Sequence, residues 1–496
     1  MKQIVLLTLV AAAAAAYAQP ESSPRFDPQQ LSRDVKILAS DEFEGRAPNT
    51  PGETKTVNFI IEQFKAAGLK PGGDVVKGQR GWTQDVPLGR FEIKGVPKLS
   101  VQQGKHRQSL TQGEEIAVRA AMNGSKQVNF ERAPLVFVGY GVSAPERRWD
   151  DFKGQDLKGK LAVVLINDPD FETGDGDFGG KAMTYYGRWT YKYEEMARRG
   201  ALGTLIVHET APASYGWATV KNSNTNVMYD IVRQQPAKAH AAVEAWIQRD
   251  FAAALFQRAG LDFESAKQQA QRRDFKPLTL TGITLSAHYA VDTQVITSKN
   301  VAALKEGSER PQQTVLYSAH WDHLGVGRPD AKGDTIYNGA VDNATGVAAL
   351  LELARAYGKA PAPKRSVVFL AVTAEERGLL GSEYYAANPV YPLATTAGMI
   401  NMDGFNPMGP ARNFTISGSA KLELLDQLIA KAQQWNMAYA PDPYTEAGHF
   451  FRSDHFPLAK RGVPAISYST GNDWVDGGLA AGKAADEAYV TNNYHQ

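Results

Sequence analysis

Residues of the types that bind metal ions recur at the ends of apolar segments in this sequence. Three short segments, each predicted to be a buried strand, lead directly to such residues: Thr314–Ser318 to His320, Ser366–Val372 to Glu375 and Glu376, and Gly398–Asn401 to Asp403. Asp342 lies in the glycine-containing loop Asn338–Gly346, between the first two strands. Functional groups gather beyond the carboxyl ends of parallel strands, so we expect these side chains to meet. One acidic residue at a strand end is usually a turn or a helix cap, but this repetition favours a metal site.

The residues in question suit two neighbouring metal ions. One carboxylate can bridge two ions about 3.5–4 Å apart, and each ion then needs a further carboxylate and an imidazole. Asp342 is the candidate bridge, Glu376 and Asp403 are the candidate terminal carboxylates, and His320 is one imidazole. Thiolate ligands are excluded because the sequence has no cysteine.

Two further acidic residues have candidate roles beside these ligands. Glu375 precedes a candidate ligand and is the right type of residue to take a proton from a metal-held water. Asp322 follows His320 by two positions, where it is placed to accept the free ring N–H of that histidine and fix its tautomer. The alternative for Asp322 is an ordinary turn aspartate.

Four motifs, in this order along the chain, resemble the signatures of the co-catalytic zinc aminopeptidases, a family related to glutamate carboxypeptidase II and the glutaminyl cyclases. They are His320-Trp-Asp322, Gly339-Ala-Val-Asp342-Asn343, Thr373-Ala-Glu375-Glu376-Arg-Gly-Leu-Leu-Gly-Ser382 and Asn401-Met-Asp403-Gly404. The resemblance implies two zinc ions bridged by Asp342, one bound by Glu376 and the other by His320 and Asp403, with Glu375 as general base. Manganese and cobalt are possible substitutes, since carboxylate and imidazole also suit them.

The second imidazole has two candidates. In the resembling family the last ligand belongs to a Tyr-His or Phe-His pair, which favours His495 over His455 and makes Tyr494 a candidate to polarise the scissile carbonyl. His323 lies in the same loop as His320 but has no matching ligand position. Relatives continue beyond the last histidine, whereas this chain stops at Gln496. We therefore expect the C-terminal part of the domain to be missing, together with the carboxylate that would orient His495.

The alternation of strands and helices predicts an α/β fold, with a mixed, mostly parallel sheet flanked by helices. We expect residues 1–18 to be a signal peptide and 19–130 the N-terminal part of the peptidase domain. An inserted β-rich module at 131–285 resembles a protease-associated domain, and 286–496 form the catalytic domain. In the module, Tyr185, Tyr186, Arg188 and Trp189 are either substrate contacts or core and surface residues.

Composition and the N-terminus limit the classes of partner. Lys plus Arg (54) nearly equals Asp plus Glu (53), which argues against nucleic acid as a partner. A lysine, an apolar run and the small-x-small pattern ending at Ala18 predict export to the periplasm or the medium after cleavage there. No later segment is long and apolar enough to cross a membrane. The sequence leaves the oligomeric state open.

The predicted function is that of a secreted zinc exopeptidase, an aminopeptidase acting on peptides. A glutaminyl cyclase-like or carboxypeptidase-like relative, and a non-catalytic binding protein of the same fold, are the alternatives. The residue specificity at the cleaved terminus stays open.

Overall fold

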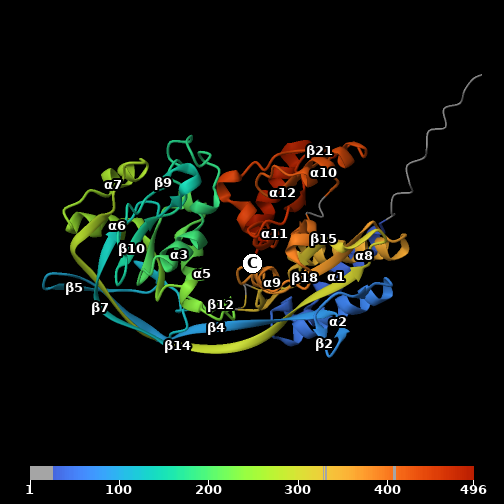
Figure 1. Ribbon diagram of the computed structural model, residues 1–496, viewed down its shortest axis with the longest axis horizontal. Helices are drawn as coiled ribbons and strands as arrows, with labels where there is room; N and C mark the ends of the chain where they lie inside the picture. The colour runs from blue at the N-terminus through green and yellow to red at the C-terminus, as the bar shows by residue number, and fades with distance from the viewer. Residues whose placement is uncertain (1–25, 328, 330–331, 406–408, 496) are drawn as a thin grey trace, which may run out of the picture.

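The computed structural model describes residues 26–327, 329, 332–405 and 409–495, so the expected signal peptide and its cleavage site near Ala18 lie outside the described residues. One large mixed sheet runs through the molecule in the order β21-β20-β22-β19-β15-β18-β14-β7-β10-β11-β13-β6. Its two ends belong to two parts of the chain, which lie on the left and right of Figure 1. The predicted α/β architecture is confirmed.

The main part contains the predicted strands that lead to the candidate ligands. They are β15 (Arg310–His320), β18 (Arg365–Val372) and β19 (Thr396–Met402), and a fourth strand, β22 (Ala465–Thr470), lies beside β19. Adjacent members of this set pair in parallel. Because parallel strands end at the same edge of a sheet, the residues after β15, β18 and β19 come together.

Helices cover this sheet because their sequences place apolar residues on one face. In α8 (Thr345–Lys359) the buried residues Val347, Leu350, Leu351 and Ala354 recur at helical spacing, and burial of each large apolar side chain contributes about 1.5–3 kcal/mol. The remaining helices of this part are α1 (Pro28–Leu38), α2 (Pro51–Ala66), α9 (Leu380–Ala387), α10 (Glu423–Gln433), α11 (His455–Ala459) and α12 (Gly478–Asn492).

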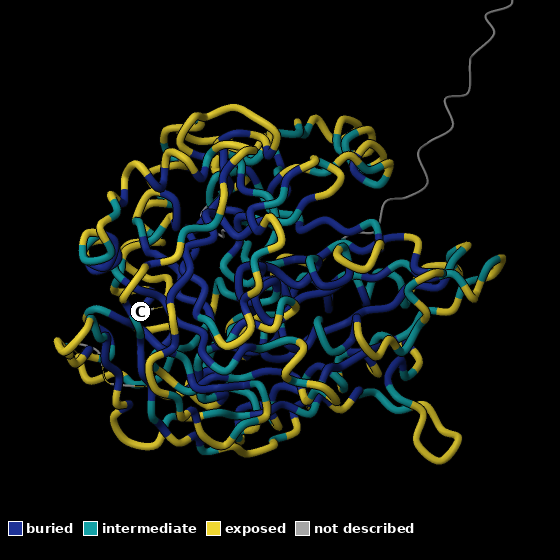
Figure 2. Tube along the Cα trace, turned by 60° about the vertical axis from the view of Figure 1, so that its left-hand side comes forward, coloured by how far each residue is buried: buried dark blue, intermediate teal, exposed yellow. Residues whose placement is uncertain are grey.

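The segment predicted to be an inserted module (residues 131–285, called the module below) shares one hydrophobic core with residues of the segment 99–128. Parallel strands β7 (Gln127–Phe137), β10 (Leu161–Leu165), β11 (Gly203–His208) and β13 (Val243–Gln248) form its sheet. The helices α3 (Trp189–Arg198), α5 (Trp217–Asn224), α6 (Arg249–Arg258) and α7 (Phe263–Ala270) lie around it. Strand β6 (Ile116–Val118) precedes residue 131 but pairs with β13. Figure 2 shows buried backbone running through the interior and exposed backbone in the peripheral loops.

Two very long strands join the module to the main part. β4 (Thr83–Gln103) and β14 (Leu278–Lys305) pair antiparallel over most of their length. Neither strand was predicted at this length, because both far exceed the usual strand length of about 3–10 residues. Helix α12 was also not predicted: Gly482 is its one buried residue, so it carries no apolar stripe.

In the described ranges, no helix combines the length and the apolar composition needed to span a bilayer.

Candidate metal centre

The loop that carries Asp342 is held in place by a glycine, an asparagine and an arginine. Gly339 has φ +60°, and a Cβ there would lie 2.6 Å from both Arg46 Nη2 and the Asp342 carbonyl, so only glycine fits. Asn343 donates to the Met402 carbonyl (3.0 Å) and accepts from the Gly404 amide (3.0 Å), which joins this loop to the end of β19.

Arg46 is a buried clamp that the sequence analysis did not single out. Its guanidinium donates to the carbonyls of Leu38 (2.6 Å), Trp321 (2.9 Å), Asn338 (2.6 Å) and Gly339 (2.7 Å). It thereby ties the loop of Asp342 to the chain that follows His320. No pattern in the sequence marks it, because the groups that it contacts are main-chain oxygens far along the chain.

Six side chains form two groups that could each hold a metal ion, and both groups include Asp342. The first consists of His323, Asp342, Glu376 and His495, and the second of His320, Asp342 and Asp403; within each group the ligand atoms lie within 4.8 Å of one another. Asp342 is thus placed between two sites, as a bridging carboxylate would be.

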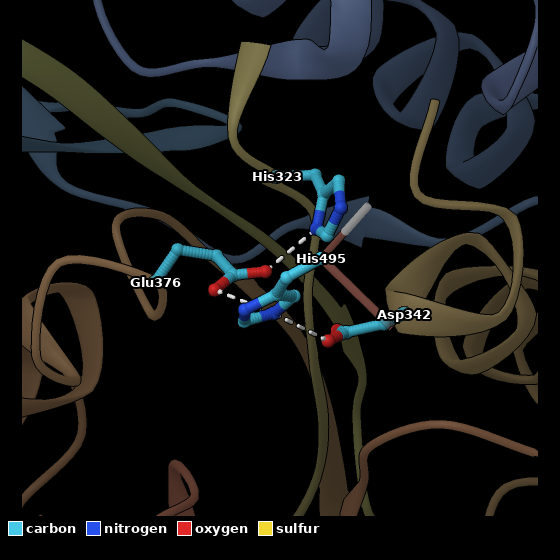
Figure 3. Close-up of side chains that lie close together, drawn as sticks. All are labelled: His323, Asp342, Glu376 and His495. Atoms are coloured by element: carbon cyan, nitrogen blue, oxygen red, sulfur yellow. Dashed lines mark hydrogen bonds and ion pairs between the residues drawn. The ribbon is translucent and has the colours of Figure 1, made fainter. Parts of the chain in front are cut away.

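The first group brings together residues from four separate segments (Figure 3). His495 Nε2 lies 3.3 Å from Asp342 Oδ2 and 3.3 Å from Glu376 Oε2. His323 Nδ1 lies 2.6 Å from Glu376 Oε1. The two oxygens of Glu376 therefore contact different imidazoles, and His323 is a member of the group that sequence reasoning set aside. The sequence signal that could have identified His323 as a member of the site is its position in the same loop as His320.

The second group is centred on His320, of which 1% is exposed. Its Nε2 lies 3.1 Å from Asp342 Oδ1 and 3.0 Å from Asp403 Oδ1. The other oxygen of Asp403 accepts from Ser453 Oγ at 2.6 Å. His320 Nδ1 lies 3.1 Å from the main-chain oxygen of Asp322 and 3.7 Å from its carboxylate.

Asp322 therefore contacts His320 chiefly through its carbonyl, which differs from the expected carboxylate contact. Its carboxylate instead accepts from the backbone amides of Glu375 (3.0 Å) and Glu376 (3.4 Å). Since a side chain that caps these amides fixes the turn after β18, Asp322 positions both glutamates at once.

Glu375 lies beside both groups and belongs to neither. Burial raises the pKa of its carboxyl well above the ordinary value; the charge on His320 opposes this, while Asp403 and Glu376 add to it. A carboxyl group whose pKa is raised is suited to accept and return a proton.

Tyr494 and His455 have opposite environments. The Tyr494 ring stacks on His495, with ring centres 3.9 Å apart, and 42% of Tyr494 is exposed. Burial and the nearby carboxylates Asp342 and Glu376 raise the pKa of its phenol. His455 is fully buried, its ring centre lies 4.8 Å from that of Phe450, and both ring nitrogens are without hydrogen-bond partners. The chain thus brings His495, and not His455, to the carboxylates.

The electrostatics of the groups favour positive charge among the carboxylates. Burial opposes protonation of His495, but Asp342 and Glu376 raise its pKa to about 10. Conversely, burial opposes ionisation of Glu376, yet its contacts with His323 and His495 lower its pKa to about 2. A divalent cation meets the same demand with neutral imidazoles as ligands.

The donor set fits such ions. Carboxylate and imidazole are the usual ligands of zinc in proteins without thiolates. Asp342 Oδ1 is buried and makes no hydrogen bond, as a free ligand atom would be. The residues present therefore fit two metal sites that share Asp342.

Comparisons with known proteins show a likeness to one family over the part of the chain that holds the ligand groups. Residues 300–496 match the sequence profile of Peptidase family M28. Over these residues, about two fifths of the chain, the sequence is similar to that family. The match covers every residue of the two ligand groups.

A solved structure supports the fold of the whole chain. An aminopeptidase from Aneurinibacillus sp. strain AM-1 aligns with a TM-score of 0.50 and 20% identity, covering 93% of this chain and 92% of that one. At this identity the likeness shows the fold alone.

Sequence relatives match shorter stretches. A probable zinc metalloprotease of Pyrenophora teres f. teres is 41% identical over 103 residues, which are 21% of this chain and 22% of that protein. A probable zinc metalloprotease of Leptosphaeria maculans is 35% identical over 212 residues, 36% of this chain and 47% of that protein. The chain thus matches less than half the length of these relatives.

Proposed function

We propose that this protein is a zinc-dependent exopeptidase of the M28 family that removes N-terminal residues from peptides. The observation that carries the proposal is the sharing of Asp342 by two ligand groups, with Glu375 beside both groups and in neither. Zinc is favoured by the donor set and by the sequence relatives, which are described as probable zinc metalloproteases. The choice of an aminopeptidase is supported by the Aneurinibacillus enzyme, whose fold extends over 93% of this chain.

His495, Asp342 and Glu376 would hold one ion, and His320, Asp342 and Asp403 the other. When bound, such ions supply Lewis-acid chemistry: they lower the pKa of water and polarise a carbonyl group. His320 can donate its Nδ1 proton to the Asp322 carbonyl, which leaves Nε2 free as a ligand. His323 contacts Glu376 Oε1 and holds that carboxylate in its orientation.

Glu375 would carry the proton through the reaction. It takes a proton from the attacking water and returns it to the nitrogen of the leaving amine, so that atoms and charges balance over one turnover. Asp322 keeps Glu375 at the centre by binding its backbone amide. Tyr494, protonated over the ordinary pH range because its pKa is raised, would donate a hydrogen bond to the carbonyl that is attacked.

The substitution Glu375→Gln tests this role. We expect kcat for an aminoacyl anilide to fall by at least about 100-fold, because general acid–base catalysis contributes 10²–10⁴-fold. Zinc content, measured by mass spectrometry of the dialysed protein, should stay at the wild-type value. The matched control is Glu306→Gln, because this carboxylate pairs with Lys70 and belongs to neither ligand group. Unchanged turnover in Glu375→Gln would refute the assignment.

Metal analysis separates hydrolysis from glutaminyl cyclisation. Two zinc ions per chain support the proposal, whereas one ion per chain together with cyclisation of an N-terminal glutamine would replace it. A protein that binds no metal at all would support the non-catalytic alternative.

The proposal extends to the parts of the chain outside the metal centre. Residues 131–285 would be a protease-associated domain inserted between the segments 19–130 and 286–496 of the peptidase domain. Cleavage near Ala18 would export the protein. N-terminal sequencing of protein recovered from the periplasm or medium tests the second point directly.

A further inference from the structure

Two arginines without acidic partners lie where the inserted module meets the main part. Arg188 precedes α3 of the module, and Arg452 follows the short helix η8 (His449–Phe451) of the main part. Only 7% of Arg188 is exposed. The Nε atoms of both arginines are buried and have no hydrogen-bond partner.

Among the residues that the structure describes, neither arginine pairs with a carboxylate. The guanidinium of Arg188 forms no hydrogen bond or ion pair within the described part of the chain. Arg452 donates to Ser214 Oγ (3.0 Å), and its Cζ lies 5.7 Å from the centre of the Tyr215 ring. Burial and, as the next largest cause, the charge on Arg452 lower the pKa of Arg188 to about 10. Two like charges therefore repel each other in a desolvated place.

Three other buried cations of this protein have hydrogen-bond or ion-pair partners. Arg46 donates to four main-chain carbonyls. Lys192 donates to the carbonyls of Tyr140 (2.6 Å) and Asn167 (3.0 Å), and Lys267 pairs with Glu172 (2.7 Å) and Glu209 (2.8 Å). A buried charge without partners is costly, so the arginine pair stands apart from the way this fold treats its other cations.

The pair adjoins the metal centre. Arg452 immediately precedes Ser453, whose hydroxyl donates to Asp403 at 2.6 Å. The charge of Arg452 also interacts with Tyr494, which stacks on His495. On the module side, the methylenes of Arg188 lie against Gly448: a Cβ on that glycine would be 3.4 Å from Arg188 Cδ.

The module is fixed against the main part at this point. The amide of Met183 donates to the Thr445 carbonyl (3.1 Å), and Lys460 pairs with Glu194 (2.8 Å). The module thus holds Arg188 in a set position relative to Arg452 and the metal centre.

We propose that Arg188 and Arg452 bind a carboxylate group of the peptide substrate beside the metal centre. The inference rests on the proposed function and adds a substrate class to it. Guanidinium groups match the geometry of a carboxylate with paired hydrogen bonds. That carboxylate is either an acidic side chain near the scissile bond or the free C-terminal carboxylate of a short peptide.

Three pairs of substrates separate these sources, because each pair differs in one carboxylate. Glutamyl and glutaminyl p-nitroanilide test the first side chain, leucyl-glutamate amide and leucyl-glutamine amide test the second, and leucyl-glutamine with its amide tests the chain end. In the zinc-loaded protein we expect a kcat/KM ratio of roughly 10–100 in favour of the carboxylate in at least one pair.

The variants Arg188→Gln and Arg452→Gln should each bring that ratio close to one. The ratio compares two substrates on one preparation, so loss of folded or active protein cancels. Arg272→Gln is the matched control, since Arg272 pairs with Asp274 in an exposed position, and it should keep the wild-type ratio. A wild-type ratio near one in all three pairs, or a preference that survives in both variants, would overturn the proposal.

A binding measurement distinguishes failure of this inference from failure of the proposed function. Thermal unfolding of the metal-free protein is followed with each member of the three pairs: leucyl-glutamine and its amide, leucyl-glutamate amide and leucyl-glutamine amide, and glutamyl and glutaminyl p-nitroanilide. The preferred carboxylate form should raise the melting temperature more than its neutral counterpart in the wild type, and equally in both variants. Equal shifts in the wild type overturn the arginine site; a retained difference without any hydrolysis overturns only the proposed function.

Discussion

The carboxylates around Asp342 and those around His240 use the same residue types but differ in charge balance. In the inserted module, Glu244 and Asp230 both contact His240, and each also pairs with an arginine, Arg119 at 2.9 Å and Arg233 at 2.6 Å. Around Asp342, the described contacts of the acidic side chains include imidazoles and no arginine or lysine side chain.

The difference separates structural charge from charge that awaits a ligand. A buried carboxylate that pairs with an arginine or lysine of the same protein has its charge balanced without a bound ion, and its role is structural. Acids that share only imidazoles can exchange the imidazole protons for a metal ion, and the arginines 188 and 452 present the reverse case, cations that lack an anion. On this view, charge balance and not residue type identifies the functional regions.

The largest expected effect comes from Arg46→Met, which tests whether this buried cation, whose charge interacts with Asp342 and Glu376, is structural. Four carbonyls would lose their donor, so we expect the free energy of unfolding of the metal-free protein to fall by about 3–5 kcal/mol. Urea unfolding measures this change. Arg272→Met, at an exposed arginine, should have little effect. A loss below about 1 kcal/mol would contradict the role of Arg46 as a clamp.

The next effect concerns His240 and depends on pH. Burial opposes protonation of His240, but Glu244 and Asp230 raise its pKa to about 9. Because the folded-state pKa exceeds the unfolded value, the ion pairs stabilise the fold fully below about pH 6.5, and the stabilisation is lost as the pH rises through about 9.

His240→Gln should therefore cost about 2–3 kcal/mol at pH 6 and under about 1 kcal/mol at pH 10. Urea unfolding of the metal-free protein at both pH values checks the difference, with His106→Gln at an exposed position as control. A cost that is the same at pH 6 and pH 10 would mean that packing, and not charge, explains the contribution of His240.

The strands and the residues at their ends were predictable because each depends on local sequence. Apolar runs predicted β15, β18 and β19, and the residues after them meet because the strands are parallel. Arg46 was not predictable, since it contacts carbonyls of residues up to 293 positions away and main-chain acceptors leave no mark in a sequence. The pairing of Arg188 with Arg452 likewise depends on how the module lies against the main part.

His323 falls between these cases, and it gives the smallest of the expected effects. It lies three positions after His320, yet its place was only evident once β15 and β18 were side by side. Its ring contacts Glu376 Oε1 at 2.6 Å while His495 contacts Oε2 at 3.3 Å. We expect His323→Gln to weaken zinc binding at the site of Glu376 by roughly 10- to 100-fold, as loss of a residue that orients a ligand does.

Competition with a chelator measures the affinity of each zinc ion, and His495→Gln serves as the comparison that removes a ligand outright. At saturating zinc, His323→Gln should still bind as many ions as the wild type, whereas His495→Gln should lose one. If His323→Gln also lost an ion at saturation, His323 would be a ligand in its own right. Unchanged affinity would instead mean that His323 only balances the charge of Glu376 in the folded protein. Pairing of a carboxylate with an imidazole, and not with an arginine or lysine, would then not be enough to identify a residue that acts in metal binding.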